Sequence, residues 1–460
     1  MQLLIELVLK QQQQIEAQQQ QIEKLKDELS KLKNRNSHNS SVPPSQDLLK
    51  KQSRKDARKP GKKRGPKYDH PGSTRNGFGQ VNQIVRLSIE TCPVCGRGFT
   101  LVEQAPLKVQ QVAELVEKPI EIWEYQRPKY HCDECGWAGY GPLPRGVKEG
   151  FSYGAKLSSV IGWLGYGGNL TWHKQIYVME SIFKVPISQG SLAKMHKWFQ
   201  ESLEPSYQQW QQWVQEPGVR CVDETTYLID GIKHWLWVAT SDQVCVLLLA
   251  PTRSSAELKQ LLGEDFKGIL TSDCFSAYNP QTATAKQKCL THLERDLRAL
   301  ETSRFVSNRD FSSKVSEILK LARLAHRDYH FGALSLEQLH SSRLQLESQL
   351  QAVLDTPPPT GWPADAQRLR QRIQKYWSDW FTFLSDPEVK PDNNDAERAL
   401  RPVVVHRKVS GTARSNWGAK LVAQMFSFLE TMRLQGANAV EALFEKLSLA
   451  SRSPPELEST

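Results

Sequence analysis

Long hydrophobic runs are absent from this sequence. The longest apolar stretch in its body is VCVLLLA at residues 244–250, which has the length of a buried strand, whereas a membrane-spanning helix needs about 20 apolar residues. The N-terminal LLIELVL contains Glu6 and lacks a preceding basic region, so it does not have the pattern of a secretory signal peptide. We therefore expect a cytoplasmic protein with no membrane partner.

Cysteine is scarce, at 8 of 460 residues, and a disulfide scaffold is not expected in a cytoplasmic chain. Four cysteines nevertheless form two C-x-x-C-G pairs, Cys92 with Cys95 and Cys132 with Cys135. In each pair two thiolates on one tight turn can reach the same tetrahedral zinc ion. The gap between the pairs is longer than in common zinc ribbons, but the two pairs together predict one structural zinc site. His131 is an alternative ligand, and redox thiols or reduced core cysteines are alternative interpretations.

Positive charge is concentrated in a single segment. The formal net charge is +10, and residues 50–67, KKQSRKDARKPGKKRGPK, contain ten Lys or Arg and one Asp. Glycine and proline spacing disfavours a helix there. Each basic side chain can displace a condensed counterion from a nucleic acid, so this arm, with Lys62, Lys63 and Arg64, predicts contact with DNA. A solvated linker or a localisation tag is the alternative.

A heptad pattern fills the N-terminal residues 1–33. β-Branched residues at position a with leucine at d favour a parallel dimer, and glutamines at d weaken it. We therefore expect a marginal coiled coil that makes a homodimer or higher oligomer, with an isolated polar helix or a disordered glutamine-rich segment as the alternatives. The a positions are Met1, Val8, Ile15, Ile22 and Leu29, and the d positions are Leu4, Gln11, Gln18, Leu25 and Leu32.

Two helices joined by a short turn are predicted before residue 216. NLTWHKQIYVMESIFKV and SLAKMHKWFQESLE flank the turn PISQG, and Ser191 is the expected N-cap of the second helix. The arrangement resembles a helix-turn-helix, which can enter a groove of DNA. Ordinary helix packing explains the pattern equally well.

The periodicity changes to that of strands from residue 218. GVRCVDETTYLI, KHWLWVATSD and QVCVLLLAP alternate as strands, and Asp230-Gly231 is a strong hairpin signal. A helix, SSAELKQLLGEDF, and a fourth strand, KGILTSDCFSAY, follow. Three strands, a helix and a further strand is the order that begins a ribonuclease-H-like fold.

Acidic residues occupy unusual places in these strands. Asp223 lies inside the first strand and Asp273 at the end of the fourth. A carboxylate in an apolar strand is costly unless it is paired or bound to a cation, and Mg²⁺ prefers such oxygen ligands. Glu397, in PDNNDAERALRPVVVHRK, is the best candidate for a third carboxylate. It also fits a capping box begun by Asn394, and we expect it both to start a capped helix and to bind metal.

The motifs, taken in order, closely resemble the transposases of the insertion-sequence-sixty-six family. The resemblance rests on VDETTYLIDGIKHWLWVATSD, LTSDCFSAYN, CLTHLERD and DNNDAERALRPVVVHRKVSGTARSNWGAK, together with NSHNSSVPPSQD and the cysteine pairs. It implies a bacterial, nucleoid-associated DDE-type DNA transposase with a ribonuclease-H-like core, a zinc-binding region and dependence on Mg²⁺ or Mn²⁺. It assigns the catalytic carboxylates to Asp223, Asp273 and Glu397.

The implied chemistry uses two metal ions, one activating the attacking oxygen and one stabilising the leaving oxygen. Asp223 is the expected bridging ligand. The implied partners are the element's terminal repeats, target DNA and accessory proteins of the same element. A catalytically silent DNA-binding relative and a simple nuclease of the same fold are the alternatives. His292 and Arg295, in CLTHLERD, are candidates for contact with phosphates, although a satisfied core histidine explains His292 equally well. Basic candidates for DNA contact, at least half of which an ordinary solvated face would also explain, are Arg398, Arg401, Arg407, Lys408 and Arg414.

Neighbouring residues have simpler interpretations. Glu224 should face away from Asp223, at the surface or behind the site. Trp417 can stack on a splayed base, but burial in the core is the better interpretation. Small core residues are expected at Cys221, Cys245, Cys274 and Cys289.

The predicted fold is multidomain α/β, in eight segments. They are a coiled coil (1–36), a disordered basic linker (37–80), a zinc-binding region (81–148), a helical, helix-turn-helix-like region (149–216), the first part of the ribonuclease-H-like core (217–298), a helical insertion (299–387), the second part of the core (388–450) and a flexible tail (451–460).

Overall fold

The computed structural model describes residues 2–33, 138–359 and 361–450, with residues 81, 84–85, 116, 119–127, 129–131, 133 and 135 between them. The chain divides into two compact units, one of Met1–Lys50 with Glu124–Thr460 and one of Lys51–Trp123. The second unit lies almost wholly outside the described residues. So do the basic arm, the C-terminal tail and three of the four proposed zinc ligands, Cys92, Cys95 and Cys132.

The N-terminal heptad segment forms one helix, α1 (Gln2–Lys33). Its apolar stripe is open to solvent, since Ile15, Ile22, Leu25 and Leu29 are each about half exposed. The predicted helix is confirmed. Its pairing with a second helix stays a prediction.

A short hairpin, β1 (Lys129–His131) with β2 (Ala138–Tyr140), encloses the second cysteine pair. The described cysteine of this pair, Cys135, is exposed. His131 Nδ1 lies 3.1 Å from Asp133 Oδ1, so this ring already has a partner. The zinc site stays a prediction.

Three helices, α3 (Ala155–Tyr166), α4 (Trp172–Ser181) and α5 (Gln189–Gln215), precede the sheet. The predicted helical character is confirmed, but the N-cap of α5 is Ser188, whose hydroxyl accepts the backbone N–H of Ser191 at 3.1 Å. The prediction of Ser191 as the cap was therefore wrong. That residue already lies in the first turn.

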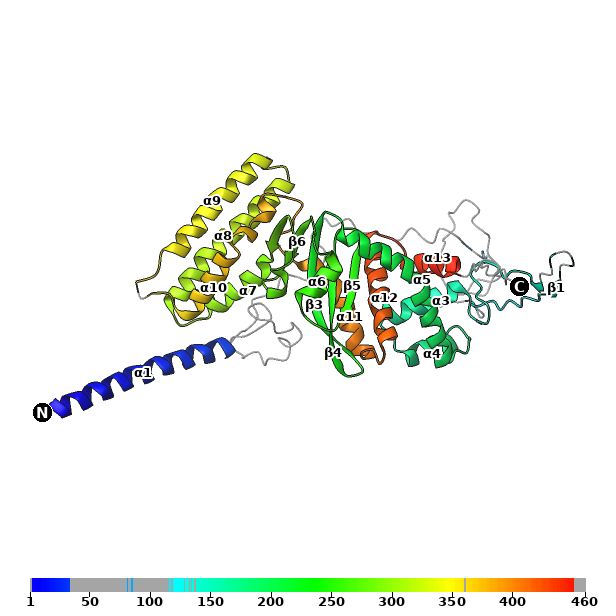
Figure 1. Ribbon diagram of the computed structural model, residues 1–460, viewed down its shortest axis with the longest axis horizontal. Helices are drawn as coiled ribbons and strands as arrows, with labels where there is room; N and C mark the ends of the chain where they lie inside the picture. The colour runs from blue at the N-terminus through cyan, green and yellow to red at the C-terminus, as the bar shows by residue number, and fades with distance from the viewer. Residues whose placement is uncertain are drawn as a thin grey trace, which may run out of the picture. The chain divides into compact units, whose positions relative to one another are not determined.

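A five-stranded mixed sheet follows in the order β5-β4-β3-β6-β7 (Figure 1). The strands β3, β4 and β5 pair antiparallel, whereas β3–β6 and β6–β7 are parallel. The Asp230-Gly231 turn has positive φ at both residues, 49° and 76°, as the hairpin prediction requires. The bounds are β3 (Val219–Ile229), β4 (Ile232–Thr240), β5 (Cys245–Ala250), β6 (Ile269–Ser272) and β7 (Ala285–Lys288).

Strand β7 was not predicted, because its sequence AKQK has no apolar alternation. Gln287 and Lys288 are nevertheless fully buried. The Gln287 amide donates to Trp380 O at 3.1 Å, and Lys288 Nζ donates to Ser272 Oγ at 2.9 Å. Hydrogen bonds to distant residues stabilise this strand in place of apolar packing.

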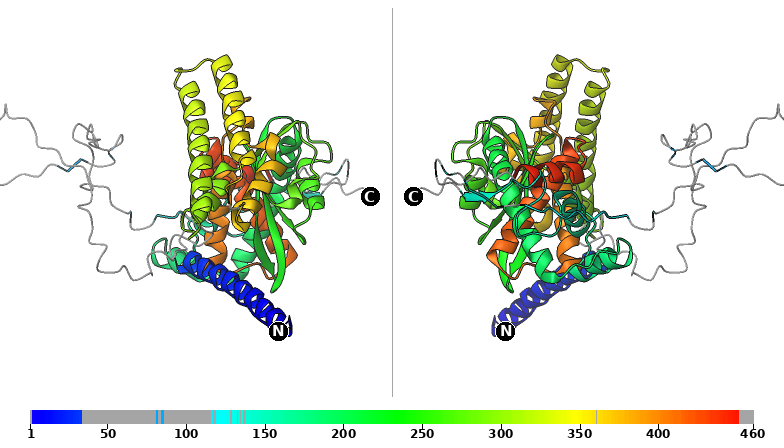
Figure 2. Two further views of the ribbon diagram at one scale, coloured as in Figure 1. Left: turned by 90° about the vertical axis from the view of Figure 1, so that its left-hand side faces the viewer. Right: turned by 90° about the vertical axis from the view of Figure 1, so that its right-hand side faces the viewer.

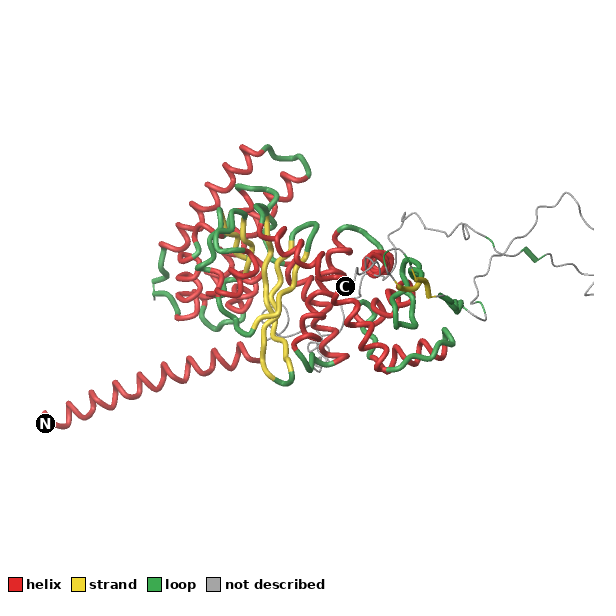
Figure 3. The backbone as a smooth tube through the Cα atoms, turned by 45° about the vertical axis from the view of Figure 1, so that its right-hand side comes forward, coloured by secondary structure: helices red, strands yellow, loops and turns green. Residues whose placement is uncertain are grey.

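Helices cover both faces of the sheet (Figure 3). One face, with Cys221, Leu236 and Leu247, packs against α11 (Asn394–Ser410) and α12 (Asn416–Leu434). The other face, with Val222 and Trp237, packs against α6 (Ser255–Leu262) and the end of α5. Along β3, odd-numbered side chains therefore face α11 near the middle of the strand, and even-numbered ones face α6.

The edge strand β5 is covered by hydroxyl groups of α12. The backbone N–H of Cys245 donates to Thr431 Oγ1 at 3.1 Å, and that of Leu247 donates to Ser427 Oγ at 2.8 Å. Ser427 and Thr431 lie one helical turn apart and satisfy two edge donors that would otherwise be unpaired. The last helix, α13 (Ala439–Ala450), packs against α3 and α5.

A helical segment with its own apolar core separates β7 from α11. It comprises α7 (Leu290–Glu301), α8 (Val306–His330), α9 (Leu336–Asp355) and α10 (Ala364–Lys375). Figure 2 shows α8 and α9 running side by side as a hairpin. The helical character predicted for this segment is confirmed.

The described residues thus form a mixed α/β structure with twelve α-helices and one five-stranded mixed sheet. None of the helices that the structure describes combines the length and the apolar composition that a membrane span requires.

Candidate active site

Asp223 lies in the middle of β3, paired with Val238 of β4, and faces α11. Its Oδ1 accepts the backbone N–H of Glu224 at 2.8 Å. Burial raises the pKa of Asp223 to about 8, and the negative charges of Glu224, Asp273 and Glu397 add to the rise. The charges of Asp273 and Glu397, which come from two other segments of the chain, thus both act on the buried Asp223 carboxylate.

Asp273 reaches this place through the parallel pairing of β6 with β3. The last register pair is Cys221 with Thr271, so two residues further along each strand Asp273 comes beside Asp223. Its Oδ1 accepts the backbone N–H of Phe275 at 2.8 Å. This bond turns the chain directly after the strand and orients the carboxylate.

Glu397 lies in the first turn of α11, whose start is tied to the sheet by Asn393. This buried residue donates from Nδ2 to Val222 O at 2.7 Å and from its backbone N–H to Cys289 Sγ at 3.2 Å. The start of α11 is therefore connected to β3 one residue before Asp223. The same bonds hold α11 on the face of β3 that carries Asp223, where the charge of Glu397 acts on that carboxylate.

The predicted capping box was wrong. The N-cap is Asn393 rather than Asn394, and its side chain makes no cap bond because its amide binds β3. Asp392 Oδ1 instead accepts the backbone N–H of Asn394, at 3.2 Å. Glu397 is therefore one residue too far along the helix for the capping-box position, and its carboxylate makes no capping bond.

His292, on α7, lies next to Glu397. Its Nδ1 is 3.8 Å from Glu397 Oε1, and one ligand atom each of Cys289, His292 and Glu397 lie within 4.8 Å of one another. Both His292 Nδ1 and Glu397 Oε1 are buried, and among the described residues neither has a hydrogen-bond partner. Buried polar atoms without partners are costly, so this pair is suited to a ligand that supplies the missing contact.

Cys289 was predicted to be a small core residue, and it is buried. Burial raises the pKa of its thiol to about 11, so the sulfur stays protonated and accepts the Asn393 N–H. Oxygen ligands from Asp223, Asp273 and Glu397 suit Mg²⁺ or Mn²⁺. The chemistry of these oxygen donors therefore suits a hard divalent cation, whereas the potential metal ligands that the described residues bring within 4.8 Å of one another are Cys289, His292 and Glu397.

Glu224 faces away from Asp223, as predicted, but it is not at the surface. Its side chain is 1% exposed, accepts from Arg253 Nε at 2.6 Å and accepts from the Tyr278 hydroxyl. The Arg253 guanidinium also stacks on Phe275, 3.6 Å from the ring centre. Since Phe275 and Tyr278 follow Asp273 closely in the chain, this network holds the Asp273 turn against β3.

Lys288, which the sequence did not suggest, supports the same turn from the other side. It is fully buried, and its Nζ donates to Asp273 O at 2.9 Å. The rings of Tyr278 and Tyr376 lie 5.6 and 5.0 Å from this ammonium group. Desolvation by burial lowers its pKa. In the sequence, the signal that could have pointed to Lys288 is its position just before the motif CLTHLERD.

The proposed DNA-contacting residues differ in their surroundings. Arg407 donates to Thr225 Oγ1 at 3.1 Å and to Thr226 O, so it ties α11 to β3. Arg398 lies 3.4 Å from Asp395. Trp417 is 37% exposed, so its predicted burial in the core was wrong. Half-buried Arg295 lies on α7, while Arg401, Lys408 and Arg414 are exposed.

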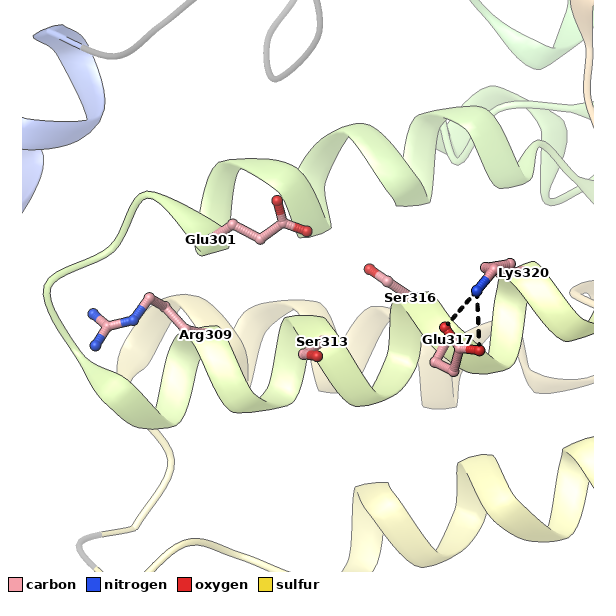
Figure 4. Close-up of a pocket in the computed structure, with 6 residues that line it drawn as sticks. All are labelled: Glu301, Arg309, Ser313, Ser316, Glu317 and Lys320. Carbon is pink, nitrogen blue, oxygen red and sulfur yellow. Dashed lines mark hydrogen bonds and ion pairs between the residues drawn. The ribbon is translucent and has the colours of Figure 1, made fainter.

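A separate hollow of about 410 Å³ lies between the end of α7 and α8 (Figure 4). Its lining combines Glu301 and Glu317 with Arg309 and Lys320, and Lys320 pairs with Glu317 at 3.2 Å. These charges balance, and none of the three carboxylates lines the hollow. We therefore place the candidate site at the convergence of β3, β6 and α11.

Residues 150–421 match the family model described as "Transposase IS66 family". Two similar curated proteins come from Sinorhizobium fredii. Uncharacterized protein y4hP is 24% identical over 409 residues, covering 79% of this chain and 71% of that protein. Uncharacterized protein y4jD is 19% identical over 384 residues, covering 77% of this chain and 73% of that protein.

Proposed function

Because the chain belongs to the transposase IS66 family, we propose that it is a DDE-type DNA transposase that cleaves the ends of an insertion sequence and joins them to target DNA. The observation that carries the proposal is that buried Asp223 of β3 feels the charges of Asp273, directly after β6, and of Glu397 on α11. Burial raises the pKa of Asp223, and the charges of Glu224, Asp273 and Glu397 raise it further; a bound cation would offset both effects.

The sheet supports a ribonuclease-H-like catalytic core. The sheet has three antiparallel strands and then two parallel ones, in the order β5-β4-β3-β6-β7. The central strand β3 contains Asp223, and its parallel neighbour β6 ends directly before Asp273. The third carboxylate comes from a helix that packs on the same face. Within this proposal residues 217–298 and 388–450 form the core, and residues 299–387 are an insertion.

Asp223, Asp273 and Glu397 would hold Mg²⁺ or Mn²⁺ ions. When bound, such ions activate the attacking oxygen and stabilise the leaving oxygen of a phosphodiester. The protein's own residues supply position: Asn393 holds the helix of Glu397 on β3, and Lys288 holds the turn of Asp273. His292 Nδ1, next to Glu397, is available to hydrogen-bond a phosphate oxygen or a bound water. Water acts as the first nucleophile and a DNA 3′-hydroxyl as the second.

The remaining parts of the chain suit assembly on DNA. The basic arm, with Lys62, Lys63 and Arg64, and the exposed Arg401, Lys408 and Arg414 would contact phosphates. Cys92, Cys95, Cys132 and Cys135 would hold a structural zinc ion. The heptads of α1 would join two copies of the chain, and accessory proteins of the same element would assist.

The test uses purified full-length protein, a labelled duplex carrying the element's end, target DNA and Mg²⁺. Asp223→Asn and Glu397→Gln should still bind the duplex but lose cleavage and joining by at least about 100-fold. Glu388→Gln, which removes an exposed carboxylate just before α11, is the matched control and should keep full activity.

Three outcomes would contradict parts of the proposal. Wild type that binds the end but never cuts it, with accessory proteins supplied, favours a silent DNA-binding protein. Wild type that cuts but never joins favours a nuclease. Normal cleavage by Glu397→Gln means that the third carboxylate lies elsewhere.

A further inference from the structure

Two histidines of α8 face one backbone carbonyl, away from the three carboxylates. His326 and His330 lie one helical turn apart, with ring centres separated by 4.5 Å. Their Nε2 atoms are 3.2 Å from each other, and they lie 3.0 and 3.1 Å from Pro387 O. Three potential ligand atoms thus form a nearly equilateral triangle.

The dimensions of this triangle suit a bound metal ion. Ligands about 2.0–2.1 Å from a tetrahedral zinc ion lie roughly 3.3–3.4 Å from one another, close to the three observed separations. Histidines at i and i+4 on one helix face are also the spacing by which two imidazoles reach one ion. Hydrogen bonds alone do not account for all three short contacts, because each Nε2 carries either one proton or one lone pair.

The surroundings hold His326 in place for such a role. Its half-buried ring packs edge-on against Phe383, with 5.3 Å between ring centres, and a second backbone hydrogen bond, with Val389, acts on the same ring. Imidazoles held by backbone partners are the usual form of metal-binding histidine.

We propose that His326, His330 and the Pro387 carbonyl form a binding site for a divalent transition metal ion such as Zn²⁺ or Ni²⁺, with water in the remaining position. The ion joins α8 to the segment 385–389. From α9, His340 Nε2 lies 3.0 Å from Ser385 O in the same segment. Because this segment runs directly into α11, the ion stabilises the connection between the helical segment and the helix that carries Glu397. The site depends on none of the proposed catalytic chemistry.

The experiment measures Ni²⁺ binding by isothermal titration calorimetry to full-length protein that has first received a single equivalent of Zn²⁺, which the four cysteines take in preference to an imidazole pair. Wild type should bind one equivalent of Ni²⁺ more than His330→Gln and His326→Gln, or bind it at least about 10-fold more tightly. His173→Gln, which removes an exposed histidine on α4, is the control and should match wild type.

Thermal unfolding distinguishes loss of the site from loss of the fold. Without metal, His330→Gln should melt within a few degrees of wild type, because this side chain is exposed. Added Ni²⁺ should raise the melting temperature of wild type and not that of the variant. Equal Ni²⁺ stoichiometry and affinity in wild type and both variants would overturn the proposal and leave ordinary hydrogen bonds as the role of the pair.

Discussion

Two neighbouring carboxylates in β3 show how a residue's partners decide its chemistry. Asp223 and Glu224 project to opposite faces of the sheet. Glu224 meets Arg253 and the Tyr278 hydroxyl, which satisfy a buried carboxylate. Asp223 is buried without a cationic partner among the described residues, and the charges of Glu224, Asp273 and Glu397 all raise its pKa. The first group is therefore structural, and the second is suited to a cation.

This difference predicts a pH-dependent stability. The folded-state pKa of Asp223 is raised from 3.8 to about 8, so folding favours its protonated form. Its ionisation costs folding free energy progressively as pH rises through this range, and the cost vanishes in acid. Metal-free Asp223→Asn should therefore be more stable than wild type by roughly 1–3 kcal/mol at pH 8, and the two should converge near pH 4.

Urea unfolding across this pH range measures the effect, with Glu388→Gln as a control that should follow wild type. Mg²⁺ should narrow the difference by stabilising wild type more than Asp223→Asn. Equal metal-free stabilities at pH 8 would show that burial and neighbouring charges do not raise the pKa of Asp223.

At the scale of elements, one arginine joins the helical segment to the candidate site. Arg323 of α8 donates to Glu294 Oε1 at 2.7 Å and to Thr291 Oγ1 at 3.1 Å, both on α7, which carries His292. It also donates to Asp392 Oδ2 at 3.3 Å, just before α11. A single guanidinium thus orients the two helices that bring His292 and Glu397 together.

Replacing the Arg323 guanidinium should weaken metal binding at the candidate site, although Arg323 is not among the proposed DNA-contacting residues. Arg323→Gln should raise the Mg²⁺ concentration for half-maximal cleavage by roughly 10-fold and lower the unfolding free energy by about 1–3 kcal/mol. Arg327→Gln, one turn further along α8 where Arg327 pairs with Asp328, is the control. An unchanged Mg²⁺ dependence in Arg323→Gln would limit this arginine to a structural role.

At the scale of the whole molecule, α1 presents its apolar stripe to solvent while its opposite side contacts the chain. Asp27 is 4% exposed, and its Oδ1 accepts from Ser303 Oγ and from the backbone N–H of Arg304, both at 3.0 Å. Asp27 occupies heptad position f, away from the seam formed by positions a and d. The open seam, with Ile15 and Ile22, is therefore available to a second copy of α1.

Changing the seam should separate the copies. Ile15→Lys with Ile22→Lys places charge at two a positions and should convert a dimer into a monomer in sedimentation velocity. Gln13→Lys with Gln20→Lys makes the same charge change at f positions and should leave the dimer intact. A wild type that sediments as a monomer would refute the coiled-coil prediction.

Local patterns in the sequence were enough to predict many of the strands and helices and the position of the candidate site. Alternation and the Asp230-Gly231 turn predicted β3, β4 and β5, helical periodicity predicted the segment before α11, and costly acids inside strands predicted the candidate site. These features depend on residues close together in the chain, where periodicity and turn chemistry can be read directly. Whether the acids are catalytic stays a proposal.

Tertiary structure alone decided the features that join distant residues. Strand β7 is polar in sequence and is stabilised by partners such as Trp380. Asn393 caps no helix with its side chain because Val222 offers that amide a buried partner. His326 and His330 gain a third potential ligand atom only where the chain returns at Pro387. Each is a contact between segments far apart in sequence, and only packing fixes which polar groups lose water together and must satisfy one another.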